Sequence, residues 1–322
     1  MAFVPRWWLC TLLLAACVVG DGDGESEPEP DDAGDAEPIA IEAEGAGTTG
    51  DFATVAQINP YYGGRFSDLD IKGPVTYQTA RRMARYIADN WPRLSVIGME
   101  EIADATNASR VAQILTEVTG KPWASQHFGR ASGADALPST EEAILWRSDV
   151  WSVAEVLGTR QVDAVDTDRG PQTLSIRFGG ILLRRTGTAH ELALFTGKLA
   201  WLGKRKNGRP LDHDDRAREA ATLMEWVDNK LVAHPNATRV IAVDLNAGYG
   251  TAPWQKFKTK YGDGGDDRPT HWTFGAKRLD GLFWDYDAGA KRGDDFGFVG
   301  GPYRSAAFGS DHRAIAARIR LR

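Results

Sequence analysis

The stretch Phe308-Gly309-Ser310-Asp311-His312-Arg313-Ala314-Ile315 lies near the carboxyl end of a 322-residue chain. It places a carboxylate directly beside an imidazole, between a Gly-Ser turn and the strand-like sequence of residues 314–321. Imidazole exchanges its proton near neutral pH, and a neighbouring carboxylate can orient it or help to hold a metal. Taken alone, Ser-Asp-His more often forms a plain turn. The rest of the sequence has to decide between these two interpretations.

Strand-like and helix-like segments alternate upstream of this stretch, from about residue 51. The patterns predict strands over residues 52–58, 94–99, 143–146, 174–183, 191–196 and 239–243. They predict helices over residues 75–90, 111–118 and 214–232, with Asn107 as the cap of the second helix and His213 in the cap region of the third. Without a repeat or an internal linker, this alternation indicates one α/β domain over residues 51–322.

Polar residues follow several of these predicted strands. Asn59 ends the first strand, Glu100 and Glu101 end the second, and Asp244 with Asn246 ends the strand at 239–243. Asp280 stands just before the apolar sequence Gly281-Leu282-Phe283-Trp284. Carboxylate and amide oxygens are ligands that suit Mg²⁺, and also Mn²⁺ or Ca²⁺, better than a soft metal. The sequence therefore predicts an oxygen-rich metal site.

The order of these motifs resembles the endonuclease/exonuclease/phosphatase superfamily, the DNase I-like proteins. The resemblance rests on five motifs in this order: Asn59, Ile97-Gly98-Met99-Glu100-Glu101, Asp244-Leu245-Asn246, Leu279-Asp280 and Ser310-Asp311-His312. Each motif is short and weak alone, whereas five in this order are a specific signal. The resemblance implies a four-layered α/β sandwich, in which two mixed β-sheets are flanked by helices.

The resemblance also implies a role for each matching residue. Glu101 matches the metal-binding glutamate of the family, Asn59 would support the metal end of the site, and Asp311 would assist the metal or its water. His312 would act as general base or contact the phosphate, oriented by Asp280. Asp244 and Asn246 would position the attacking water and the scissile phosphate.

Two positions depart from the family pattern. Lys198 stands where the family often has a histidine, in Thr196-Gly197-Lys198-Leu199. A lysine can contact a phosphate oxygen but is a poor proton shuttle near pH 7 unless it is desolvated, so Lys198 is either a substrate contact or a surface residue. Glu100 stands where the family usually has glutamine. It either adds a negative charge near the metal or points away from it, because adjacent strand residues face opposite sides.

The first fifty residues have a different character. Residues 1–20 read as a secretory signal, and Leu14-Ala15-Ala16-Cys17 resembles a bacterial lipobox, which predicts a lipid anchor at Cys17. The alternative is an ordinary signal cut near Gly20. Residues 21–50 hold 11 acidic residues and no Lys or Arg, which predicts a disordered spacer. Both cysteines, Cys10 and Cys17, fall inside the signal, so no disulfide is expected in the exported domain.

Together these features predict an exported, divalent-metal-dependent phosphoesterase, secreted or lipid-anchored at the cell envelope. A phosphodiester is the expected substrate, with nucleic acid first, since the remainder after residue 50 carries 37 basic and 33 acidic residues. Two alternatives stay open: a sphingomyelinase-like phospholipid phosphodiesterase, and a surface or binding protein of the same fold that has lost catalysis. The protein is expected to be a monomer, and membrane contact is expected only through the anchor.

Overall fold

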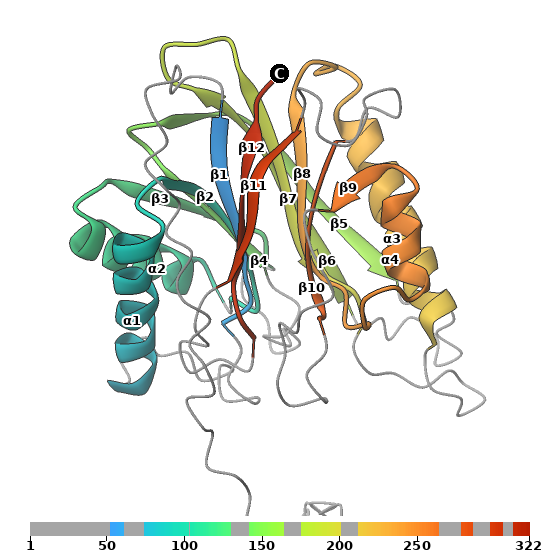
Figure 1. The fold of residues 1–322 in the computed structure, drawn as a ribbon, viewed down its shortest axis with the longest axis horizontal. Helices are drawn as coiled ribbons and strands as arrows, with labels where there is room; N and C mark the ends of the chain where they lie inside the picture. The colour runs from blue at the N-terminus through green and yellow to red at the C-terminus, as the bar shows by residue number, and fades with distance from the viewer. Residues whose placement is uncertain are drawn as a thin grey trace, which may run out of the picture. The chain divides into compact units, whose positions relative to one another are not determined.

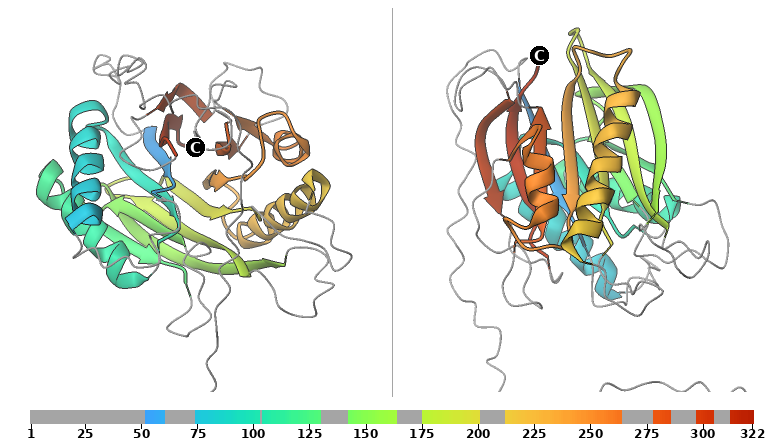
Figure 2. Two further views of the ribbon diagram at one scale, coloured as in Figure 1. Left: turned by 90° about the horizontal axis from the view of Figure 1, so that it is seen from below. Right: turned by 90° about the vertical axis from the view of Figure 1, so that its right-hand side faces the viewer.

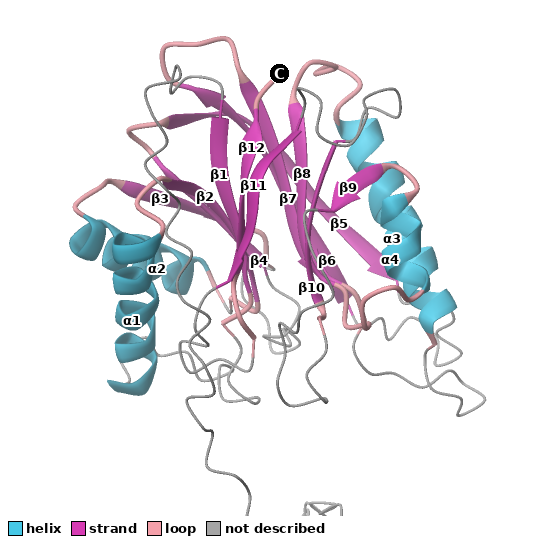
Figure 3. Ribbon diagram, in the orientation of Figure 1, coloured by secondary structure: helices cyan, strands magenta, loops and turns pink. Residues whose placement is uncertain are grey.

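Two six-stranded mixed β-sheets pack face to face in the computed structural model, and helices cover their outer faces (Figures 1 and 3). The structure describes residues 52–60, 74–102, 104–129, 142–163, 175–200, 212–263, 278–285, 297–304 and 312–322. The four layers are those of the predicted α/β sandwich. In this part of the chain, none of the helices combines the length and the apolar character needed to cross a membrane.

The first sheet has the strand order β11-β12-β1-β2-β4-β3. Strands β1 and β2 pair in parallel and α1 connects them, whereas the other neighbours in this sheet pair antiparallel. The elements of this half are β1 (Phe52–Ile58), α1 (Pro74–Asn90), β2 (Leu94–Glu100), α2 (Ala105–Thr119), β3 (Trp123–His127), β4 (Glu142–Arg147), β11 (Gly297–Arg304) and β12 (Ile315–Arg320).

The second sheet repeats this plan with the order β5-β6-β7-β8-β10-β9. Its parallel pair is β7 and β8, joined by α3. The elements are β5 (Trp151–Asp163), β6 (Ser175–Arg185), β7 (Glu191–Lys198), α3 (His213–Lys230), β8 (Thr238–Asp244), α4 (Ala252–Lys258), β9 (Tyr261–Asp263) and β10 (Asp280–Asp285). Each sheet therefore has a parallel β-α-β unit, and the carboxyl ends of the two strands in a unit lie at the same edge.

Three apolar clusters hold the layers together. One lies between the sheets and includes Val55, Val96, Leu194 and Val240. The other two lie on the outer faces, where α1 and α2 cover the first sheet and α3 and α4 cover the second (Figure 2). Because side chains alternate along a strand, each central strand supplies one inner and one outer cluster. This double burial explains the nearly continuous apolar sequences of β2 and β8.

Each predicted segment corresponds to an element of the structure, with differences at the ends. The cap of α2 is Asp104 and not Asn107, since the Asp104 side chain accepts the backbone N–H of Asn107 at 2.7 Å. Asp212 caps α3 in a reciprocal capping box with Asp215, so His213 is the first helical residue, in the predicted cap region. The sequence reasoning did not predict β3, β5, β9, β11 or α4.

A glycine allows the two sheets to approach closely. Gly98 on β2 faces β7 and β8 across the inter-sheet space, and a Cβ atom built there would lie 2.7 Å from the Ala242 Cβ and 2.8 Å from the Thr196 Oγ1. Neither separation is tolerable between unbonded heavy atoms, so a side chain here would force the sheets apart. Glu100, two residues further along β2, would move with them.

We predict that Gly98→Ala lowers the free energy of unfolding by roughly 1–3 kcal/mol, because the added methyl group overpacks the space between the sheets. Thermal or urea unfolding would measure this loss. The double variant Gly98→Ala/Ala242→Gly, which removes the nearest opposing methyl group, should recover part of it. Unchanged stability of the single variant would show that the sheets do not meet here as described.

Candidate active site

The site lies at one edge of the space between the sheets, where the inner faces of several strands change from apolar to polar. On β8 the inward side chains are Val240, Ala242 and then Asp244, and on β10 Asp280 precedes Leu282. Asp244 and Asp280 are direct partners in the antiparallel register of β8 and β10. Strand alternation alone therefore brings these two carboxyl groups together from positions 36 residues apart in the sequence.

Hydrogen bonds join the two sheets at this edge. The Gln57 Nε2 on β1 donates to the Glu100 Oε2 on β2 and to the Asp280 Oδ1 on β10, both at 2.9 Å. From β7, the Thr196 hydroxyl donates to the Glu100 Oε1 at 3.2 Å. All four side chains are buried. Sequence reasoning missed Gln57 and Thr196, although each stands at an inward position, two residues before Asn59 and Lys198 respectively.

His312 precedes β12 and contacts Asp280. Its Nδ1 lies 2.9 Å from the Asp280 Oδ2 and 3.1 Å from the Oδ1. An ionised carboxylate can only accept, so Nδ1 carries the proton in this contact and Nε2 is left to face Asp244, whose Oδ2 is 4.0 Å away. The structure thus places Asp280 where a residue that orients His312 should be.

Asp244 is held by two asparagines. The Asn59 Nδ2 donates to its Oδ2 at 3.2 Å, and the backbone N–H of Asn246 donates to its Oδ1 at 2.9 Å. Burial raises the pKa of Asp244, and the neighbouring Asp280 adds to this effect, while His312 and Lys198 oppose it. Asp244 is therefore a fixed, more basic carboxylate than an exposed one.

Glu101 forms a buried ion pair with Lys198. The Lys198 Nζ contacts the Glu101 Oε1, and the two side chains are only 5% and 7% exposed. Burial alone would lower the pKa of Lys198, but the carboxylates of Glu101 and Asp244 outweigh it and raise the pKa above its usual value. Lys198 is therefore a buried partner of Glu101 and not a surface residue.

Backbone strain is concentrated at the same edge. Within the described residues, the non-glycine residues with positive φ are Glu101, at 60°, and Asn246, at 47°. Asparagine visits this left-handed region readily, whereas glutamate does so at a cost of about 1 kcal/mol. The turn that follows β2 thus directs Glu101 into the site at the expense of local stability.

Glu100 points into the site rather than away from it. It is fully buried, and its register partner on β4 is Glu142, which is also fully buried. Burial raises the pKa of Glu100 well above its usual value, and the charges of Glu142, Asp280 and Asp244 raise it further. This favours the neutral acid, which has nearly the shape of a glutamine side chain.

The backbone that carries Lys198 is fixed by its surroundings. The Leu199 N–H donates to the Asp244 carbonyl at 2.8 Å, and the Asn246 Nδ2 donates to the Leu199 carbonyl at 2.7 Å. The Ala200 N–H donates to the Glu219 Oε2 at 3.0 Å. The Arg216 Nε of α3 donates to the Ala200 carbonyl at 2.6 Å. These bonds hold the end of β7 against β8 and α3.

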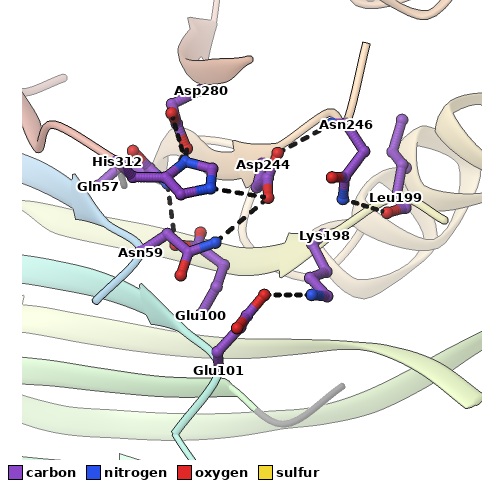
Figure 4. A network of polar contacts seen from close by, with 10 residues as sticks. All are labelled: Gln57, Asn59, Glu100, Glu101, Lys198, Leu199, Asp244, Asn246, Asp280 and His312. Carbon is purple, nitrogen blue, oxygen red and sulfur yellow. Dashed lines mark hydrogen bonds and ion pairs between the residues drawn. The ribbon is translucent and has the colours of Figure 1, made fainter. Parts of the chain in front are cut away.

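The predicted site residues converge. Seven of the eight gather at this edge: Asn59, Glu101, Lys198, Asp244, Asn246, Asp280 and His312 (Figure 4). The eighth, Asp311, lies outside the described residues, as do Cys17 and the whole of residues 1–50. Ligand atoms of Asp244, Asp280 and His312 all lie within 4.8 Å of one another, close enough to share a metal ion.

Comparison with known proteins identifies the fold. No family model and no curated protein matches the sequence. Among solved structures, an endonuclease/exonuclease/phosphatase from Bacteroides vulgatus matches with a TM-score of 0.58 and 13% identity, over 84% of this chain and 99% of that chain. A mannosyl-6-phosphatase from Bacteroides thetaiotaomicron matches with a TM-score of 0.55 and 16% identity, over 82% and 98%.

The human Nocturnin catalytic domain, in a structure with a bound sulfate anion, matches with a TM-score of 0.56 and 10% identity, over 84% of this chain and 95% of that chain. At such low identity these matches establish the fold. The chain has the endonuclease/exonuclease/phosphatase fold, as the order of its motifs predicted.

Two adjacent glutamates should respond in opposite ways to the same substitution. Glu100→Gln replaces an acid that burial keeps neutral, so we expect the stability at pH 7.5 to stay equal or to rise. Glu101→Gln leaves the buried ammonium of Lys198 without its counter-charge, so we expect a loss on the order of 3 kcal/mol. Urea unfolding of both variants measures the difference, and a larger loss for Glu100→Gln would contradict both assignments.

Glu219 should make stability depend on pH. Burial raises its pKa from 4.5 to about 7, and the hydrogen bond from the Ala200 N–H opposes this. Because the folded protein holds this proton more tightly than the unfolded chain, ionisation of Glu219 costs stability as the pH rises from about 4.5 to about 7. The melting temperature of wild type should therefore fall relative to Glu219→Gln between pH 5 and pH 8. A constant difference would refute the raised pKa.

Proposed function

We propose that the chain is a divalent-metal-dependent phosphoesterase that cleaves phosphodiester bonds. The observation that carries the proposal is the buried group in which His312, hydrogen-bonded to Asp280 through Nδ1, turns Nε2 toward Asp244. An imidazole with a fixed tautomer beside a fixed carboxylate suits proton transfer during hydrolysis. The fold supports a phosphoesterase of either kind, because its named matches include a phosphatase.

Each residue has a separate task in this proposal. Asp244, held by the Asn59 amide and the Asn246 N–H, orients the attacking water and accepts its proton. His312 contacts the phosphate or transfers a proton at Nε2, and Asp280 maintains its ring orientation. Asn246 helps to position the scissile phosphate, and its own side chain is held in place by the hydrogen bond from its Nδ2 to the Leu199 carbonyl.

The residues at this edge suit a hard divalent ion, although one of them, Glu101, is also paired with Lys198. Glu101, Asn59 and Asp311 would hold Mg²⁺, or Mn²⁺ or Ca²⁺, and the oxygen and nitrogen atoms of Asp244, Asp280 and His312 lie near enough to contribute. When bound, such an ion polarises the phosphate and stabilises developing negative charge. A metal ion at Glu101 would share this carboxylate with the ammonium of Lys198.

Nucleic acid is the proposed substrate, supported by the excess of basic over acidic residues after residue 50. The named mannosyl-6-phosphatase favours a second candidate, a small phosphomonoester. Phospholipid hydrolysis, and a binding function without catalysis, remain the alternatives. Export, the lipid anchor at Cys17 and the acidic spacer stay predictions from residues 1–50.

A panel of substrates can separate these functions. The purified protein would be incubated with DNA, RNA, bis-p-nitrophenyl phosphate, p-nitrophenyl phosphate and sphingomyelin, each with Mg²⁺ and with EDTA. Nucleic-acid cleavage should weaken steeply with added salt, whereas hydrolysis of a small monoester should not. Absence of EDTA-sensitive hydrolysis on every substrate would favour the non-enzymatic alternative.

His312→Asn should lower kcat/KM by two to four orders of magnitude on the substrate that the panel identifies. Asparagine can still donate to Asp280, so the fold should be preserved, but it has no titratable nitrogen to present to Asp244. The matched control is His234→Asn, which changes a histidine that pairs with Glu155 outside the site. Equal activity of His312→Asn and wild type would contradict the proposed role.

A further inference from the structure

The buried contact between Lys198 and Glu101 sets this site apart from a simple cluster of metal ligands. Lys198 reaches Glu101 from β7 of the second sheet, while Glu101 follows β2 of the first sheet. Both side chains are almost completely shielded from water. The negative charge of a buried, ion-paired carboxylate is already balanced by its partner. A bound metal ion would balance the same charge.

Metal binding at Glu101 has to displace or oppose this ammonium. The Lys198 Nζ contacts the Oε1, so a metal ion that used this oxygen would break the ion pair. A metal ion on the other oxygen would lie within a few ångströms of a positive charge. Coulomb repulsion at that range is strong in a site with little water. In either arrangement the two cations compete for one carboxylate.

The ammonium also has a second anionic neighbour. Lys198 and Asp244 are paired residues of the parallel strands β7 and β8, so their side chains start from neighbouring backbone positions. The backbone on the carboxyl side of Lys198 is fixed by the hydrogen bonds of Leu199 and Ala200. A change of partner from Glu101 toward Asp244 thus requires rotation of the lysine side chain alone.

We propose that Lys198 is a built-in cation that competes with the divalent metal for Glu101 and thereby weakens metal binding at this site. Lys198 occupies Glu101 in the metal-free protein, and the metal ion binds at the cost of moving the ammonium away. Lys198 would thus set how tightly the proposed phosphoesterase binds its metal ion. The identity of the metal rests on the proposed function, whereas the competition itself can be measured without any hydrolysis.

The test is a calorimetric titration of the purified protein with Mn²⁺ and with Mg²⁺. Lys198→Gln removes the competing charge, so it should bind Mn²⁺ at least tenfold more tightly than wild type. Lys198→His, which introduces the residue often found here in the family, should tighten binding as well at pH 8, where histidine is neutral. Lys198→Arg keeps the charge and should bind as weakly as wild type.

A matched control corrects for net charge. Lys260→Gln removes an equal charge from a lysine that pairs with Asp228 away from the site, and should bind Mn²⁺ as wild type does. If Lys198→Gln does not fold, the comparison of Lys198→His with Lys198→Arg decides the question. The proposal is overturned if the foldable neutral variants bind no more tightly than wild type, or if no variant binds Mn²⁺.

These outcomes are separable from those of the proposed function. Tighter metal binding by Lys198→Gln without hydrolysis of any substrate would support the competition and refute the phosphoesterase. Metal-dependent hydrolysis with equal metal affinities in wild type and Lys198→Gln would support the phosphoesterase and refute the competition.

Discussion

Exclusion of water from the edge between the sheets is the constraint on which the site depends. Five carboxyl groups are buried there or next to it, those of Glu100, Glu101, Glu142, Asp244 and Asp280, together with Lys198 and His312 as the nearby bases. Five negative charges could not remain so close in a medium of low dielectric constant. The protein has to neutralise them individually, and the structure shows how it does so for most of them.

Each acid is accommodated by a different means. Glu100 is favoured in its neutral form by burial and by its negative neighbours. Glu101 is paired with an ammonium, and Asp280 with an imidazole. Asp244 receives hydrogen bonds from neutral amides and sits close to both bases, without a dedicated cation of its own. A divalent ion would therefore act mainly on the charges of Asp244 and Glu101, which is where the proposed chemistry requires it.

Much of this arrangement could be predicted from the sequence. The order of the short motifs identified the site residues, and the apolar segments before or after them located the strands. Asp244 and Asp280 stand at the ends of nearly continuous apolar segments, and such residues meet at a sheet edge once the register is set. The partner of Lys198 could not be predicted, because no local pattern relates β7 of one sheet to the turn after β2 of the other. Gln57 and Glu142 were missed for the same reason: their importance depends on strand pairing.

The strand β5 was missed because residues 152–156 are all exposed, so no alternation of buried and exposed positions marks a strand there.

The presence of a lysine at position 198 can be understood in the light of these charges. A neutral imidazole at this position would leave Glu101 without a counter-ion until a metal arrived, and the buried strained turn at Glu101 would then carry an unpaired charge as well. Lysine supplies a positive charge on a flexible stem and pairs with Glu101 without the help of a metal ion. The stability of this pairing has to be given up when the metal binds, because linkage requires that whatever favours the metal-free state weakens the metal by an equal free energy. Under the proposed competition, a weaker hold on the metal and a paired Glu101 in its absence both follow from one residue, Lys198.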